Sequence, residues 1–184
     1  MKIKPVILCG GSGTRLFPGL KNFPSKQFID FGGWNLFEKT LERIKDKAFD
    51  SPIISTNKTY LNPVIKAIKK KKITEFKIIL EPSKKNTAAA IISASLLDEI
   101  KLGQPILFLP SDHFIQLKKK FNKVLCSNLK NLNNKNVFIF GIKPKIPRSD
   151  YGYLLNKTNN KRVNKVINFI EKPKKKLAIK LLKK

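Results

Sequence analysis

The amino-acid sequence predicts an α/β fold built around a mainly parallel sheet, and three observations support this prediction. Short apolar segments alternate along the chain with segments whose apolar residues recur at helical spacing, which is the pattern of βαβ units. The chain has 184 residues, 41% of them hydrophobic, which is enough to bury a sizeable core in one domain. No apolar run approaches the length of a membrane span, so we expect a soluble domain.

Each predicted strand is a short apolar run, and the predicted helices lie between the strands. The strands are expected at residues 6–9, 52–55, 76–80, 105–109 and 137–142. The helices are expected around residues 37–48, 61–68, 88–97 and 121–125. Right-handed crossovers would place these helices on both faces of the sheet. Residues 151–155 and 163–170 are expected to form two further strands, followed by a helix that starts near Pro173 and has Leu177, Ala178, Leu181 and Leu182 on its apolar face.

A glycine-rich segment follows the first predicted strand. Its three glycines remove side chains from a turn, so backbone N–H groups can approach an anion closely, while Arg15 and Lys26 add cations that suit phosphate oxygens. The residues of this predicted triphosphate cradle are Gly10, Gly11, Ser12, Gly13, Thr14, Arg15 and Lys26. The spacing matches neither a Walker A loop nor the G-x-G-x-x-G fingerprint, because no Lys-Ser or Lys-Thr follows and Leu16 stands at the third glycine position. A plain glycine-rich turn is the alternative.

Residues with candidate chemistry follow the other predicted strands at the same end. Glu81 follows the third strand, Asp112 the fourth and Gly141 the fifth. Ligands of parallel sheets bind outside the carboxyl ends of the strands, so these residues are expected on one edge. Asp112 could start a Mg²⁺ site, since this ion takes one or two carboxylates plus phosphate oxygens; a helix N-cap is the alternative. A structural role is expected for His113, the only histidine.

The motifs together resemble the mannose-1-phosphate guanylyltransferases, a family of sugar-1-phosphate nucleotidyltransferases. The resemblance covers nearly the whole chain, and the Glu-Pro dipeptide followed by Asn-Thr-Ala favours the guanylyl branch over thymidylyl or uridylyl relatives. The segments that carry it are Cys9 to Leu16 with Lys26-Gln27-Phe28, Leu80 to Ile91, Leu109-Pro110-Ser111-Asp112-His113, Phe140-Gly141-Ile142, Tyr151-Gly152-Tyr153, and Phe169-Ile170-Glu171-Lys172-Pro173.

The resemblance implies a Rossmann-like three-layer nucleotidyltransferase fold over residues 1–184, as the N-terminal part of a catalytic domain that is incomplete at its C-terminus. It implies transfer of GMP from GTP to mannose 1-phosphate, with GDP-mannose and pyrophosphate as products and Mg²⁺ as cofactor. The implied catalytic residues are Arg15, Lys26 and Asp112, with Asp112 as metal ligand.

Two further groups of residues receive roles. Glu81, Asn86 and Thr87 are expected to border the nucleobase, although Asn86-Thr87 also suits a helix N-cap. Gly141, Gly152, Glu171 and Lys172 are expected to bind the sugar phosphate. The alternatives are another sugar-1-phosphate nucleotidyltransferase, or a nucleotide-binding or nucleic-acid-binding fragment without turnover.

The net charge of +27 raises the question of a nucleic-acid partner. Only four of the 39 basic residues are arginines, and the lysines are scattered along the whole chain. A nucleic-acid reader would more often show arginines, or aromatic residues interleaved with basic ones, so we expect lysines on solvated faces and no nucleic-acid partner. No membrane partner is expected, and a homo-oligomer is a possible assembly. The two cysteines, Cys9 and Cys126, are far apart, which favours a reduced, cytoplasmic setting.

Overall fold

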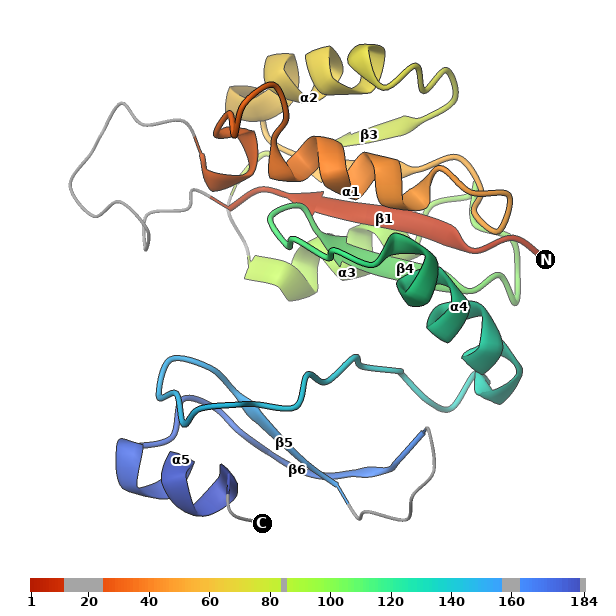
Figure 1. The fold of residues 1–184 in the computed structure, drawn as a ribbon. Coiled ribbons are helices and arrows are strands. Elements are labelled where there is room, and N and C mark those ends of the chain that lie inside the picture. Colours follow the sequence, from red (N-terminus) through yellow and green to blue (C-terminus); the bar gives the residue numbers. More distant parts are fainter. Residues whose placement is uncertain (12–24, 84–85, 157–162, 183–184) are drawn as a thin grey trace. The chain divides into compact units, whose positions relative to one another are not determined.

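The structure, a computed structural model, describes residues 1–11, 25–83, 86–156 and 163–182. It divides the chain into two compact units, Met1–Leu129 (unit 1) and Lys130–Lys184 (unit 2) (Figure 1). Unit 1 contains a parallel sheet with its helices, and unit 2 contains a two-stranded antiparallel sheet and a short helix. None of the helices in these described ranges is long and apolar enough to cross a membrane.

The sheet of unit 1 has four strands in the order β3-β2-β1-β4, and every pairing is parallel. The strands are β1 (Lys4–Cys9), β2 (Ile53–Thr56), β3 (Lys77–Leu80) and β4 (Ile106–Pro110). Strand β1 lies inside the sheet, where Val6 pairs with Ile53 on one side and Phe108 on the other. Helices cover both faces of β1, which is why its sequence is an almost continuous apolar run. The predicted α/β class with a mainly parallel sheet is confirmed.

Helices cover the two faces of this sheet unequally. Helices α1 (Leu36–Ile44), α2 (Lys58–Lys70) and α4 (Lys118–Asn128) share a core with one face. Helix α3 (Asn86–Ser95) covers the opposite face, where its Ala94 packs with Val6 and Ile53 (Figure 1). Alternate residues of β1 point to the two cores, as the pleat of a strand requires. Unit 1 is therefore a three-layer structure.

Asparagine side chains start two of these helices. The Asn35 side chain accepts a hydrogen bond from the Glu38 N–H at 2.8 Å, and the Asn57 side chain accepts one from the Tyr60 N–H at 3.2 Å. Such caps satisfy backbone donors that have no partner inside the helix. The structure also has two short 3₁₀ helices, η1 (Lys26–Phe28) in unit 1 and η2 (Leu129–Asn131) where the two units meet in the sequence.

Unit 2 pairs strand β5 (Tyr153–Asn156) with β6 (Val166–Ile170) in antiparallel register, Tyr153 opposite Ile170. Helix α5 (Lys175–Leu182) follows, and of its apolar residues Ala178 is the one fully buried.

The predicted strand at residues 137–142 is wrong. These residues lie outside every strand that the structure describes, and Val137 and Ile142 are 91% and 93% exposed. A strand forms only where its N–H and C=O groups pair with a neighbouring backbone, and an apolar run does not supply that neighbour. Gly141, expected at the end of this strand, therefore lies in an irregular segment.

Candidate functional site

The carboxyl edge of the unit 1 sheet gathers most of the predicted nucleotide-binding residues that the structure describes. Gly10 and Gly11 follow β1, Glu81 follows β3, and Ser111 and Asp112 follow β4. Because the three strands are parallel, these residues lie at the same end of the sheet. Ser12, Gly13, Thr14 and Arg15 lie outside the described residues.

Lys26 and Asp112 form an ion pair at this edge. Lys26 Nζ lies 3.4 Å from Asp112 Oδ2, and the two side chains are 34% and 37% exposed. His113 is near the same carboxylate, with Nε2 4.0 Å from Asp112 Oδ1. A cation and a carboxylate, both reachable from solvent, thus stand where the sequence predicts phosphate and metal contacts.

Asp112 suits a magnesium ion that arrives with a nucleotide. Among the described residues, no group of three or more His, Cys, Asp or Glu side chains could hold a metal ion. Mg²⁺ seldom needs such a cage, since it keeps several waters and is often bound by one or two carboxylates together with substrate phosphates. One half-exposed aspartate beside a lysine fits that mode of binding.

Gln27 ties Lys26 to the start of the glycine-rich segment. The Gln27 side chain is buried, and its Nε2 donates to the Gly11 carbonyl oxygen at 3.2 Å. The next residue, Phe28, packs edge-on against Phe37 with ring centroids 5.6 Å apart. These two contacts hold helix η1, and they thereby fix the position of the Lys26 backbone. Gln27 belongs to a sequence motif, but nothing in the sequence indicated this role for it.

Glu81 is held across from Gly10. Its carboxylate Oε1 accepts a hydrogen bond of 2.6 Å from the Ser55 hydroxyl, and its backbone N–H donates to the Thr56 carbonyl oxygen at 2.7 Å. A Cβ atom built on Gly10 would lie 3.5 Å from each carboxylate oxygen. Sequence reasoning missed Ser55, because nothing in a strand-forming segment marks which hydroxyl meets a carboxylate 26 residues later.

Cys9 at the end of β1 is not an activated nucleophile. Burial raises the pKa of its thiol to about 11, although hydrogen bonding with Ser111, Gln27 and Thr56 acts in the opposite direction. A thiolate is the reactive form of cysteine, so the buried, protonated Cys9 serves packing. The remaining candidate chemistry at this edge is cationic and carboxylate chemistry.

Asn86 and Thr87 begin helix α3, and both side chains are exposed. The φ angle of Asn86 is +64°, a left-handed conformation that asparagine adopts more readily than most non-glycine residues. Among the described residues, no contact of either side chain bears on the expected contact with the base, which stays a prediction.

Unit 2 brings Gly152, Glu171 and Lys172 together. A Cβ on Gly152 would lie 3.0 Å from Glu171 Oε2, and Lys172 Nζ is 3.1 Å from Glu171 Oε1. The same Cβ would lie only 2.4 Å from Phe169 Cζ, so the aromatic ring leaves no room for a side chain there. Gly141 is less crowded, with Leu154 Cδ1 at 3.4 Å from a built Cβ.

A three-layer α/β unit with glycines, a lysine and a carboxylate at the carboxyl ends of parallel strands is typical of proteins that bind phosphorylated ligands. Comparison with known proteins specifies the family. The chain belongs to the nucleotidyl transferase family, whose model matches residues 4–184.

Characterised relatives are similar over nearly the whole chain. It is 36% identical to a mannose-1-phosphate guanylyltransferase of Sinorhizobium fredii, over 98% of this chain and 36% of the relative. It is 34% identical to a mannose-1-phosphate guanylyltransferase of Escherichia coli, over 95% of this chain and 39% of the relative. The crystal structure of a mannose-1-phosphate geranyltransferase from Thermus thermophilus matches with a TM-score of 0.80 and 25% identity, over 100% of this chain and 54% of that one. The chain thus spans less than two-fifths of the length of these two curated relatives. The predicted membership of the nucleotidyltransferases is therefore confirmed.

Proposed function

We propose that the chain transfers GMP from GTP to mannose 1-phosphate, giving GDP-mannose and pyrophosphate. The observation that carries this proposal is the Lys26–Asp112 pair at the carboxyl edge, 3.4 Å apart and next to the glycine-rich segment. The activity for which the guanylyltransferase relatives are named supports the choice of sugar phosphate.

The proposed reaction is an in-line displacement at the α-phosphorus of GTP. A phosphate oxygen of mannose 1-phosphate forms the new bond to that phosphorus while the bond to the β-phosphate oxygen breaks, and pyrophosphate leaves. Because the attacking oxygen is already anionic, no general base is required, which agrees with the protonated Cys9 and with a structural role for His113. The protein then contributes positioning and charge neutralisation.

The residues divide this work between them. Lys26 and Arg15 neutralise the departing pyrophosphate. Asp112 would hold Mg²⁺, which would supply further positive charge at the phosphates. Glu171 accepts hydrogen bonds from sugar hydroxyls while Lys172 meets the sugar phosphate. Glu81, Asn86 and Thr87 border the base. The free cysteines Cys9 and Cys126 suit a cytoplasmic compartment.

Product analysis tests the proposal. The purified 184-residue chain is incubated with Mg²⁺, one of the four common nucleoside triphosphates, and mannose 1-phosphate or glucose 1-phosphate, and the products are separated by anion exchange. We expect GDP-mannose as the preferred product. Lys26→Ala and Arg15→Ala are each expected to lower turnover about a hundredfold, the usual effect of removing one donor aimed at developing charge.

Lys39→Ala is the matched control for Lys26→Ala. Lys39 also pairs with one carboxylate, Glu42 at 3.1 Å, and the exposure of this pair, 35% and 37%, nearly equals that of Lys26 and Asp112. The control should keep full turnover, since neither Lys39 nor its partner Glu42 has a role in the proposed reaction. Preferred use of another nucleotide or sugar phosphate would point to a different nucleotidyltransferase. GTP binding without any product would point to a nucleotide-binding protein.

A further inference from the structure

Glu81 places a negative charge at the edge of the sheet where phosphates are proposed to bind. The chain carries a net charge of +27, yet this carboxylate lies beside Gly10 at the start of the glycine-rich segment. Within the described part of the chain, Glu81 has no ion-pair partner. A carboxylate repels phosphate and accepts hydrogen bonds only. The ligand group that Glu81 meets must therefore be a donor, and in a nucleotide the donors belong to the base or to the ribose.

The carboxylate is held in a fixed place by β2. Ser55 is fully buried, and in the sheet register it stands between Leu8 of β1 and Ile79 of β3. Its hydroxyl donates to Glu81 Oε1 at 2.6 Å, which is the short distance of a charge-assisted O–H···O⁻ bond. The Glu81 backbone is fixed as well, by its bond to Thr56. Both the main chain and the side chain of Glu81 are thus positioned before any ligand binds.

Guanine is the base that suits such an acceptor. It presents two adjacent donors, N1–H and N2–H₂, which can meet the two oxygens of one carboxylate. Hypoxanthine keeps N1–H and lacks the amino group, and adenine has an unprotonated acceptor at N1. A carboxylate with a set orientation therefore separates these three bases by the number of hydrogen bonds that it accepts.

We propose that Ser55 is a positioning residue for nucleobase selectivity, which orients the Glu81 carboxylate so that it accepts hydrogen bonds from N1–H and N2–H₂ of guanine. The inference rests on the proposed function, because it assumes that a nucleotide occupies this edge. Without the hydroxyl, Glu81 keeps its charge but loses the bond that orients it. The difference in affinity between GTP and other nucleoside triphosphates should then shrink, while the affinity for triphosphates as a class changes less.

Calorimetric titration with GTP, ITP and ATP tests the proposal. The titrations contain Mg²⁺ and no sugar phosphate, so that binding is measured without turnover. The unaltered chain should bind GTP about tenfold more tightly than ITP, the effect of one hydrogen bond to a charged group, and ATP more weakly still. Ser55→Ala should lower the ratio of ITP to GTP dissociation constants by about threefold to tenfold. Glu81→Gln changes a half-exposed side chain and does not threaten folding. It should bring the ratio of ITP to GTP dissociation constants close to one.

Thr40→Val is the matched control for Ser55→Ala. Thr40 is also fully buried, and its hydroxyl donates to the Leu36 carbonyl oxygen at 3.1 Å within α1. Its loss removes a buried hydroxyl of the same kind without touching Glu81, so the ratio should stay as in the unaltered chain. A thermal melt of each variant verifies that the proteins compared are folded.

Three results would overturn the inference in distinguishable ways. Equal affinity of the unaltered chain for GTP, ITP and ATP would show that Glu81 does not read the base. A Ser55→Ala protein with an unchanged ratio would remove Ser55 from selectivity, whatever Glu81→Gln does. No binding of any nucleotide would overturn the proposed function itself, and this inference with it.

Discussion

At the scale of single residues, packing requires glycine at position 152. Other glycines of the chain are required by backbone conformation, for example Gly33 with a φ angle of +87°. Gly152 has no such angle; instead, Phe169 Cζ and Cε2 stand 2.4 Å and 2.6 Å from the place of its Cβ. From the sequence, this glycine is expected to bind the sugar phosphate. In the structure, the side chains of Phe169 and Glu171 approach it.

Gly152→Ala should therefore destabilise the β5–β6 pair. Overpacking of this kind typically lowers the free energy of unfolding by about 1–3 kcal/mol. Because Phe169 is half exposed, the ring can be pushed outward, and its displacement would also disturb Glu171. Hydrogen exchange at the β5 and β6 amides, measured by mass spectrometry, reports the loss of protection.

Two companion variants make the Gly152→Ala result specific. Gly141→Ala meets only Leu154 at 3.4 Å, so its effect should be much smaller. Phe169→Ala removes the obstructing ring, so adding Gly152→Ala to it should cost nothing further. Equal effects of Gly152→Ala with and without the Phe169 ring would refute the packing explanation.

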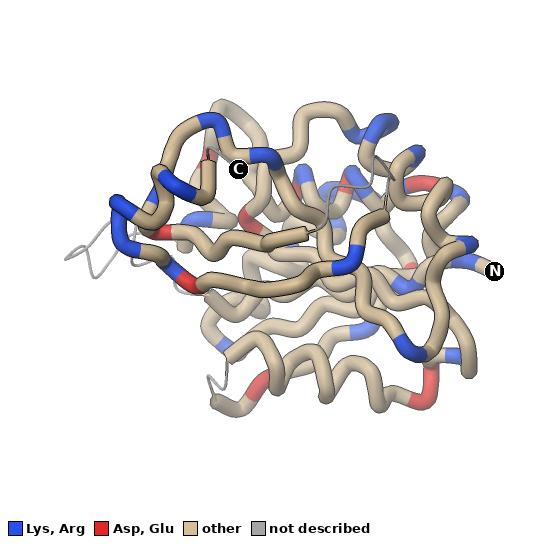
Figure 2. The backbone as a smooth tube through the Cα atoms, turned by 90° about the horizontal axis from the view of Figure 1, so that it is seen from below, with Lys and Arg blue, Asp and Glu red and all other residues tan. Residues whose placement is uncertain are grey.

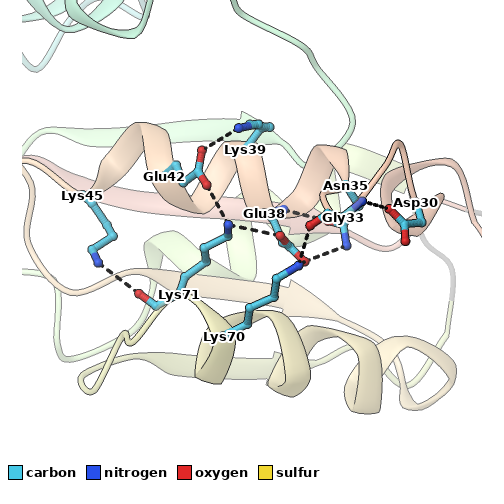
Figure 3. Close-up of polar contacts among 9 residues, drawn as sticks. All are labelled: Asp30, Gly33, Asn35, Glu38, Lys39, Glu42, Lys45, Lys70 and Lys71. Carbon is cyan, nitrogen blue, oxygen red and sulfur yellow. Dashed lines mark hydrogen bonds and ion pairs between the residues drawn. The ribbon is translucent and has the colours of Figure 1, made fainter.

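At the scale of elements, helices α1 and α2 are joined by a charged cluster around Glu38 (Figure 3). The Glu38 side chain is 5% exposed, and its two oxygens pair with Lys70 at 2.9 Å and Lys71 at 3.1 Å. Glu42, one turn further along α1, also pairs with Lys71, at 2.6 Å. Burial acts to raise the pKa of Glu42, but hydrogen bonds from Lys71 and Lys39 outweigh it and lower the pKa. The ionised Glu42 therefore stabilises the fold fully at pH values above its ordinary pKa of 4.5. This stabilisation is lost as the pH falls through the lower pKa of the folded state.

Glu38→Ala should destabilise unit 1 more than Glu42→Ala. Removing the buried carboxylate leaves two lysines without their shared partner and empties a packed position, which we expect to lower the free energy of unfolding by about 2–3 kcal/mol. The Glu42 side chain is 37% exposed, and exposed pairs contribute about 0–1 kcal/mol. Urea denaturation followed by circular dichroism measures both. A larger effect at Glu42 would contradict the assignment of Glu38 as the central residue of the cluster.

Periodicity predicted the elements well but could not predict their contacts. The first strand was expected at residues 6–9 and spans Lys4–Cys9, and the second was expected at 52–55 and spans Ile53–Thr56. The bonds from Ser55 to Glu81 and from Gln27 to Gly11 join residues 26 and 16 positions apart, so they depend on strand register and loop path, which composition does not encode. The apolar run at residues 137–142 was predicted to be a strand and is not one, because a strand also needs a neighbouring backbone with which to pair.

At the scale of the whole chain, basic residues are dispersed rather than gathered. Figure 2 shows Lys and Arg positions at many separate places along the backbone. Several are engaged in local structure, such as Lys45, which donates to the Lys71 carbonyl oxygen at 3.0 Å, and Lys4, which pairs with Asp50 at 3.5 Å. The remaining positive charge attracts nucleotide anions and raises their rate of encounter. It attracts any polyanion for the same reason.

Binding to duplex DNA should therefore be weak, independent of sequence and strongly dependent on salt. Lysines contact phosphates as point charges and carry no base information, and each phosphate that they neutralise releases counterions. Fluorescence anisotropy with two labelled duplexes of unrelated sequence is expected to give equal affinities, which fall by more than about tenfold between 50 and 200 mM salt. An excess of GTP should leave much of the binding intact, because the positive charge is spread over the chain rather than concentrated around Lys26. A tight complex at physiological salt that distinguishes the two duplexes would contradict this prediction. It would mean that the basic residues form an organised nucleic-acid-binding surface, and that the positive charge serves nucleic-acid binding rather than the sugar-nucleotide reaction.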